Sequence, residues 1–223
     1  MNIETILGDC DRELADGRSP DLALLGFWRA VAHVKRHPEL ADAHADPMAA
    51  IDREAFRRWA LLMVPLGVGT AMMILGTLFG LAITGAAYSV DAPWNGLLIL
   101  AGTGILLVPT HGLGHLIVGR LLGIRFTDWF IGSWKMPQPG VKVDYGSYLR
   151  ASPRARAWMH ASGAIVTKLI PFLNLGAAWG AGAPAWTLWV LATLGAAMIV
   201  TDVAWSTKAS DWKKFRRELR YAR

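Results

Sequence analysis

Long apolar stretches dominate the pattern of hydrophobic and polar positions along the chain. Three of them are near or above the roughly 20 residues that cross a bilayer as a helix. They are residues 60–87, 94–122 and 183–205. Between the last two lies a less purely apolar stretch, about 156–179, which is the third of four in chain order. It carries His160 and Lys168, and ionisable groups inside a bilayer are costly and commonly functional. The pattern predicts an all-α integral membrane protein with four transmembrane helices, a membrane domain that covers residues 60–207.

The segment before the first apolar stretch has a different pattern. Leu22, Leu25, Trp28 and Val31 recur at helical spacing, which predicts an amphipathic helix. We therefore expect residues 1–59 to form a small helical cap. At the other end of the chain, residues 208–223 are rich in lysine and arginine and are expected to form a basic tail.

The loop between the second and third apolar stretches, residues 123–150, alternates apolar and polar side chains around two prolines. This alternation suits short strands and predicts a small β-hairpin, whose edge could pair with an extended peptide. A structured loop at the membrane interface, anchored by Trp129 and Trp134, explains the same residues equally well.

Composition and charge set the class of protein. Hydrophobic residues make up 53% of the 223 positions, and the formal net charge is +6. Mean hydropathy is +0.32. Lysine and arginine gather in the central loop and the tail, which predicts that both lie in the cytoplasm together with both termini, as in a bacterial inner (plasma) membrane. The positive charge is explained by orientation and by contact with the lipid bilayer, so no nucleic acid partner is expected. The lone Cys10 excludes an intrachain disulfide and a multi-cysteine zinc site.

The second apolar stretch contains two histidines that are candidate metal ligands. His111 and His115 are one helical turn apart, so both imidazoles lie on one face and could bind one cation. Asp202 is expected at a similar depth on the cytoplasmic half of the bilayer, and His160 lies in the first turns of the third stretch. Two histidines and a carboxylate with an open position constitute a catalytic type of zinc site. We therefore predict a zinc ion on His111, His115 and Asp202.

These residues resemble those of a known family, the site-2 proteases, which are membrane-embedded zinc metalloproteases. The resemblance covers about residues 94–212. The run from His111 to His115 resembles the family's H-E-x-x-H helix, and Asp202 resembles its distal aspartate ligand. The resemblance implies intramembrane proteolysis of a transmembrane or extended peptide substrate.

A second segment carries the same resemblance in a weaker form. The run from Gly163 to Thr167 looks like the family's G-P-x-x-N segment, with Ala164 in place of proline and threonine in place of asparagine. No glycine follows Asp202, although one usually follows the distal aspartate in the family.

The largest departure from the family is Gly112, which stands where the family has its glutamate general base. A glycine cannot take a proton, and losing a positioned base typically costs about 10² to 10⁴ in rate. Asp144 and Asp128 in the central loop are the remaining substitutes for the base. Lys168 and Thr167 are candidates for polarising a substrate oxygen or for holding the groups around the metal.

Three functions remain open at this point. One is a divergent but active intramembrane metallohydrolase. Another is a pseudoenzyme that keeps the fold and the zinc and binds membrane-protein partners through the central loop. The third is a haem- or chlorophyll-binding subunit, which would need a histidine on a second helix, such as His160, because His111 and His115 point the same way.

Overall fold

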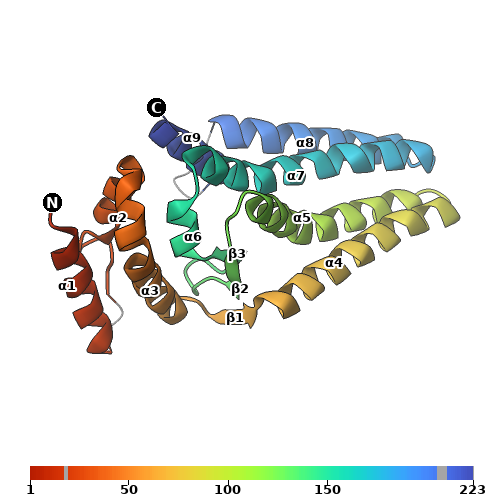
Figure 1. Ribbon diagram of the computed structural model, residues 1–223. Coiled ribbons are helices and arrows are strands. Elements are labelled where there is room, and N and C mark those ends of the chain that lie inside the picture. The colour runs from red at the N-terminus through yellow and green to blue at the C-terminus, as the bar shows by residue number, and fades with distance from the viewer. Residues whose placement is uncertain (18–19, 205–209, 223) are drawn as a thin grey trace. The chain divides into compact units, whose positions relative to one another are not determined.

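The computed structural model describes residues 1–17, 20–204 and 210–222 (Figure 1). Residues 205–209 and 223, assigned above to the end of the fourth apolar stretch and to the basic tail, lie outside this part of the chain. The α-helices are α1 (Ile3–Ala15), α2 (Phe27–Arg36), α3 (Ala41–Trp59), α4 (Leu66–Ala86), α5 (Trp94–Leu121), α6 (Tyr145–Arg150), α7 (Pro153–Gly180), α8 (Ala185–Ala204) and α9 (Asp211–Leu219). Short 3₁₀ helices are η1 (Pro38–Leu40), η2 (Ala87–Ser89) and η3 (Arg220–Ala222). The strands are β1 (Leu62–Pro65), β2 (Phe126–Ile131) and β3 (Pro139–Val143).

The chain forms two compact units that alternate along the sequence. The cap unit comprises Met1–Leu66, Gly119–Arg156 and Glu218–Arg223. The bundle unit comprises Gly67–Val118 and Ala157–Arg217. The central loop and the end of the chain therefore belong to the same compact unit as the N-terminal helices.

Four helices are long and apolar enough to cross a membrane, which confirms the predicted fold class. They are Leu66–Ser89, Trp94–Leu121, Pro153–Gly180 and Ala185–Asp202. In the bundle unit these helices run alongside one another (Figure 1). Small residues allow close approach: a Cβ at Gly80 of α4 would lie 2.8 Å from Leu106 of α5, and one at Gly102 would lie 2.9 Å from the Gly80 carbonyl oxygen.

The first span begins later than the apolar pattern predicts. Leu62–Pro65 form strand β1, which pairs antiparallel with β2, and the helix begins at Leu66. A short apolar run does not distinguish a strand from a buried helix by its periodicity. Here the partner strand, about 65 residues later in the sequence, decides the conformation.

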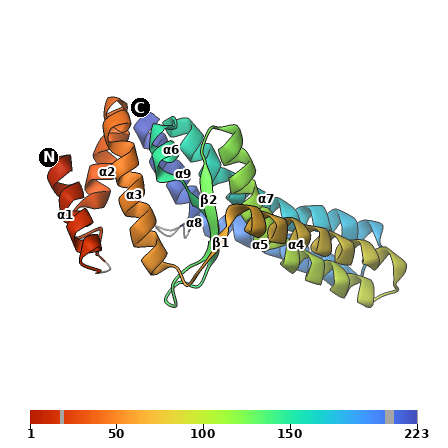
Figure 2. The ribbon, with the colours of Figure 1, turned by 60° about the horizontal axis from the view of Figure 1, so that its bottom comes forward.

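The predicted β-hairpin is present in the cap unit and is part of a three-stranded antiparallel sheet in the order β1-β2-β3. Figure 2 labels two of these strands, β1 and β2. A register shift lies between Phe126 and Asp128. Trp129 is buried in this sheet, whereas Trp134 in the turn between β2 and β3 is 86% exposed. Of the two tryptophans named as anchors, only Trp134 is therefore on the surface.

The N-terminal helices α1, α2 and α3 surround the core of the cap unit. Its fully buried side chains include Phe27, Val34, Met48 and Ile51. The amphipathic helix predicted from Leu22 onward begins only at Phe27, because residues 22–26 form turns. Leu22 still packs against this core, so the pattern identified the buried face correctly.

Ion pairs, both buried and exposed, connect distant segments of the cap unit. Lys142 of β3 donates to Asp52 of α3 at 2.5 Å, and Arg150 of α6 makes two hydrogen bonds, 2.8 and 2.7 Å, to Asp46. Glu218 is fully buried and accepts from Lys35 at 2.6 Å and from Arg156 at 2.8 Å. Buried charges are tolerated where each one has such a partner.

Candidate metal centre

The two histidines of α5 face one another across a single helical turn. The ring centroids of His111 and His115 are 4.6 Å apart, and their Nε2 atoms are 3.2 Å apart. This is the geometry that the i, i+4 spacing predicts. The His111 side chain is 36% exposed and that of His115 is 11% exposed, so the pair is accessible from the His111 side.

Hydrogen bonds on the far side of each ring fix which nitrogen carries the hydrogen. His115 Nδ1 lies 2.7 Å from the Met159 carbonyl oxygen, which can only accept. His111 Nδ1 lies 2.8 Å from Thr167 Oγ1, whose own hydroxyl donates to the Gly163 carbonyl at 2.8 Å. Each Nδ1 is therefore the donor, and each Nε2 of a neutral ring presents its lone pair to the other. This is the arrangement that orients metal-binding histidines.

The third group at this site is Asp211, the first residue of α9. Its Oδ2 atom lies 3.2 Å from Nε2 of His111 and 3.2 Å from Nε2 of His115. Ser210 caps the helix by accepting from the Lys213 N–H at 3.3 Å, and Lys214 Nζ holds the other carboxylate oxygen at 3.0 Å. The start of α9 thus orients the carboxylate towards the histidines.

The Asp211 carboxylate is ionised in this setting. Burial raises the pKa of Asp211, but hydrogen bonds donated by protonated His111 and His115 and the charges of His115 and Lys214 lower it more, so that this pKa lies well below its usual range. When both rings are neutral instead, three electron-pair donors converge within hydrogen-bond distance of one another. One proton could form a hydrogen bond across only one of the three contacts, whereas a metal ion could bind all three donor atoms.

The spacing of the three donors fits a small divalent cation. Zinc–ligand bonds of about 2.0–2.1 Å in a tetrahedron separate neighbouring donors by about 3.3–3.4 Å. All three separations here are 3.2 Å. Among the described residues, His111, His115 and Asp211 are the group of histidine, cysteine and acidic side chains close enough to hold a metal ion.

Two glycines allow α5 and α7 to approach closely at this site. A Cβ at Gly163 would lie 2.3 Å from His115 Nε2, so that a larger residue would displace the ring. A Cβ at Gly114 would lie 3.3 Å from the Ser162 carbonyl oxygen. The segment from Gly163 to Thr167 therefore contributes both the space for one imidazole and the acceptor for the other.

The structure does not place Asp202 beside the histidines, in contrast to the sequence-based expectation. Asp202 of α8 forms an ion pair with Lys168 of α7, whose ammonium also donates to the Ala164 carbonyl at 3.1 Å. Two opposite charges in apolar spans stabilise each other and reduce the cost of placing each in a membrane. Lys168 is thereby engaged with Asp202, and the carboxylate of the metal group is Asp211.

The remaining candidate residues have other surroundings. The His160 ring centroid is 6.5 Å from that of His115, and His160 is outside the metal-binding group. Asp128 and Asp144 belong to the cap unit, where Asp144 accepts from Arg125 at 3.1 Å and caps α6. Gly112 is buried within α5 and contributes no side chain.

Sequence reasoning missed Asp211 because it assigned residues 208–223 to a basic tail. The available signal was local: Ser210-Asp211 is a typical helix start, and Trp212, Phe215 and Leu219 follow at helical spacing. A short amphipathic helix directly after a span can return a side chain to the span's end. The sequence alone could have suggested this helix, but not its contact with residues about 100 positions earlier.

No family model, curated protein or solved structure matches this chain. Its class is therefore defined by the fold and the site alone. The chain is a helical membrane protein with four span-length helices, and its bundle unit contains a His-His-Asp group that could hold a metal ion.

Proposed function

We propose that this protein is an intramembrane zinc-binding protein of the site-2-protease type, with zinc held by His111, His115 and Asp211. The observation that carries the proposal is the convergence of three donor atoms at mutual separations of 3.2 Å. Both histidines have their Nδ1 atoms engaged elsewhere, which leaves Nε2 for the metal. Three protein ligands leave a fourth position open, as in catalytic zinc sites.

Zinc bound here would supply a Lewis acid that lowers the pKa of bound water to about 7. The protein would hold the ion by the three donors and position the rings through Met159 and Thr167. Lys214 would keep the Asp211 carboxylate in place. These residues provide binding and orientation, whereas proton transfer requires a further group.

The three donors include no further group that would accept a proton from water. Gly112 stands at the position where the resemblance to the site-2 proteases implies that base. The absence of a base lowers the rate of hydrolysis by about 10² to 10⁴. We therefore propose that the protein binds zinc without efficient peptide hydrolysis and acts as a pseudoenzyme that engages transmembrane or extended peptide partners.

Elemental analysis of the purified, untagged protein tests the proposal. We expect one equivalent of zinc in the parent protein and a loss of metal in His111→Ala, His115→Ala and Asp211→Asn. Iron in place of zinc would contradict the assignment, because two histidines and one carboxylate also form the site of non-haem iron(II) enzymes. A metal-free parent protein that binds no added zinc would overturn the proposal.

The matched control removes the other membrane carboxylate. Replacing Asp202 alone would leave the Lys168 ammonium without its partner, so the control is the double variant Lys168→Met with Asp202→Leu. It should keep the zinc. Loss of metal in this variant, with metal retained in Asp211→Asn, would restore Asp202 as the ligand.

A further inference from the structure

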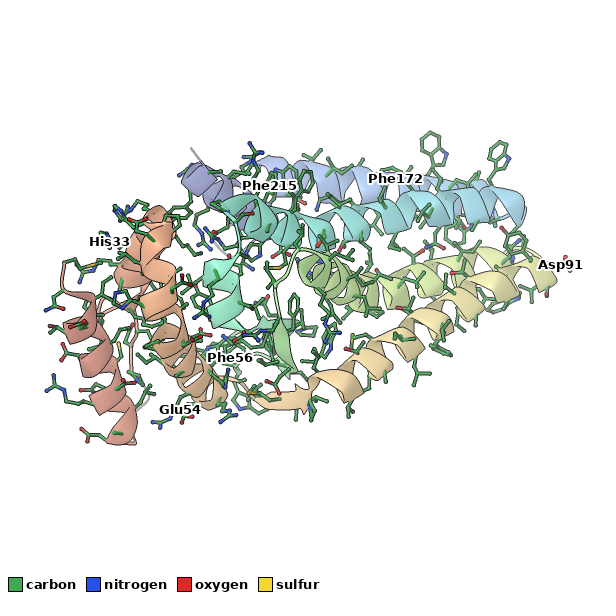
Figure 3. All side chains as sticks on the ribbon, in the orientation of Figure 1. His33, Glu54, Phe56, Asp91, Phe172 and Phe215 are labelled. Carbon is green, nitrogen blue, oxygen red and sulfur yellow. The ribbon has the colours of Figure 1, made fainter. Side chains whose placement is uncertain are left out.

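A second pair of histidines with the same spacing lies at the end of α2, outside the metal centre described above. His33 and His37 are four residues apart, and their ring centroids are 4.5 Å apart (Figure 3 labels His33). The corresponding distance for His111 and His115 is 4.6 Å. His37 N–H donates to the His33 carbonyl at 3.1 Å, so the helical spacing persists up to His37.

An acidic residue orients one ring of this pair. Nδ1 of His37 lies 3.2 Å from Oε1 of Glu39, in η1. Because a carboxylate accepts, Nδ1 is the donor, and Nε2 of a neutral His37 ring keeps its lone pair. A carboxylate that accepts from the far nitrogen of a histidine is the usual outer partner of a metal ligand.

This pair is more open to solvent than the metal centre of α5. The side chains of His37 and Glu39 are 48% and 69% exposed. The nearest lysine along the helix, Lys35, is turned into the cap unit and paired with Glu218. An ion bound between the two rings could complete its coordination with water.

We infer that His33 and His37 form a second metal site, for a borderline divalent transition metal such as Ni²⁺ or Cu²⁺, with Glu39 as the orienting carboxylate. Imidazole is a good ligand for these ions, and the rings of His33 on α2 and of His37 at its C-cap are close enough, at 4.5 Å between centroids, to share one ion. Glu39 belongs to η1, so the bound ion would also stabilise the junction between α2 and η1. This inference does not depend on zinc binding at His111 and His115.

Calorimetric titration with Ni²⁺ tests the site. The untagged double variant His111→Ala, His115→Ala lacks the two α5 ligands and is expected to bind one equivalent of Ni²⁺. Adding His33→Ala or His37→Ala should abolish this binding. Adding Glu39→Gln should weaken it about 10- to 100-fold. His44→Ala, which removes a histidine of α3, is the matched control and should leave binding unchanged.

The same titration in the parent background covers the case in which the α5 double variant fails to fold. There the stoichiometry should fall by one equivalent in His33→Ala and stay constant in His44→Ala. Equal stoichiometry in His33→Ala, His37→Ala and the parent would overturn the second site. That result leaves the α5 centre untouched, since the α5 centre is tested by its own variants.

Discussion

Nε2 of His115 and Oδ2 of Asp211 lie 3.2 Å apart, although 96 positions separate the two residues in the sequence. The contact joins the C-terminal third of α5 to the first residue of α9. It converts a two-ligand spacing on one helix into a three-ligand group. Nε2 of His111 lies at the same distance from this oxygen, so the distances between the donor atoms are nearly equal.

Gly163→Ala should strongly reduce zinc binding. The added Cβ would lie 2.3 Å from His115 Nε2, so the ring must move away from the other two donors. Crowding of this kind typically costs about 1–3 kcal/mol, which corresponds to roughly 10- to 100-fold weaker binding when it falls on the liganded state. Zinc affinity can be measured by competition with a chromophoric chelator.

Gly176→Ala is the control for this prediction. It lies on the same helix, and a Cβ there meets no atom within 4 Å. Zinc affinity should be unchanged, and helix stability should rise slightly because alanine restricts the unfolded chain. Equal zinc affinities for Gly163→Ala and Gly176→Ala would show that close approach at residue 163 does not matter.

Hydropathy was sufficient to predict the four spans, because each one is a long run of apolar residues whose length is set by the bilayer. Helix–strand choice at Leu62–Pro65 was not predictable, since β1 depends on its pairing with β2. The candidate histidines were identified from local spacing alone. The carboxylate was not, because Asp202 and Asp211 are both near the end of the last span and only tertiary contacts distinguish them.

The buried triad of Lys35, Arg156 and Glu218 had no signal in the sequence. Its members come from three distant segments, and 183 positions separate Lys35 from Glu218. Each of these residues lies in a charged or mixed stretch that is typical of a solvated surface. Burial of such groups cannot be predicted from the sequence, because it depends on the fold bringing opposite charges together.

Thr167→Val should weaken zinc binding about 10- to 100-fold, because it removes the oxygen that accepts from His111 Nδ1 while keeping the shape of the side chain. Thr167→Ser should retain the affinity. Thr77→Val on α4 is a matched control, since the Thr77 hydroxyl also donates to a carbonyl one turn earlier, that of Met73, which belongs to no histidine. An unchanged zinc affinity in Thr167→Val would show that Thr167 does not contribute to zinc binding.

Glu218 makes the stability of the cap unit sensitive to acid. Burial raises the pKa of Glu218, but Lys35 and Arg156 lower it more, so the folded pKa lies below the ordinary value of 4.5. A carboxyl group with a lowered folded pKa stabilises the fold fully above its unfolded pKa. That contribution is lost as the pH falls from about 4.5 through the folded pKa, and thermal unfolding followed by circular dichroism should show the loss.

Glu218→Gln should lower the stability at neutral pH by about 3–5 kcal/mol, because two buried cations lose the carboxylate that they share. It should also remove part of the acid sensitivity below pH 4.5. Glu4→Gln alters an exposed carboxyl group and serves as the control, with little change in either property. The same acid sensitivity in Glu218→Gln and the parent would assign the effect to other carboxyl groups.

Gly112→Glu should raise peptide hydrolysis by about 10² to 10⁴ over the parent, because it restores a carboxylate one residue after His111, where a general base can act on water at the metal. Gly112→Gln has a similar size and no basic carboxylate, so it should stay at the parent rate. Both variants can be assayed in detergent with a fluorogenic casein substrate, alongside zinc analysis. If Gly112→Glu retains zinc and hydrolyses the substrate as slowly as Gly112→Gln, the missing base is not the reason for slow hydrolysis. Access of the peptide to the metal centre would then limit the rate.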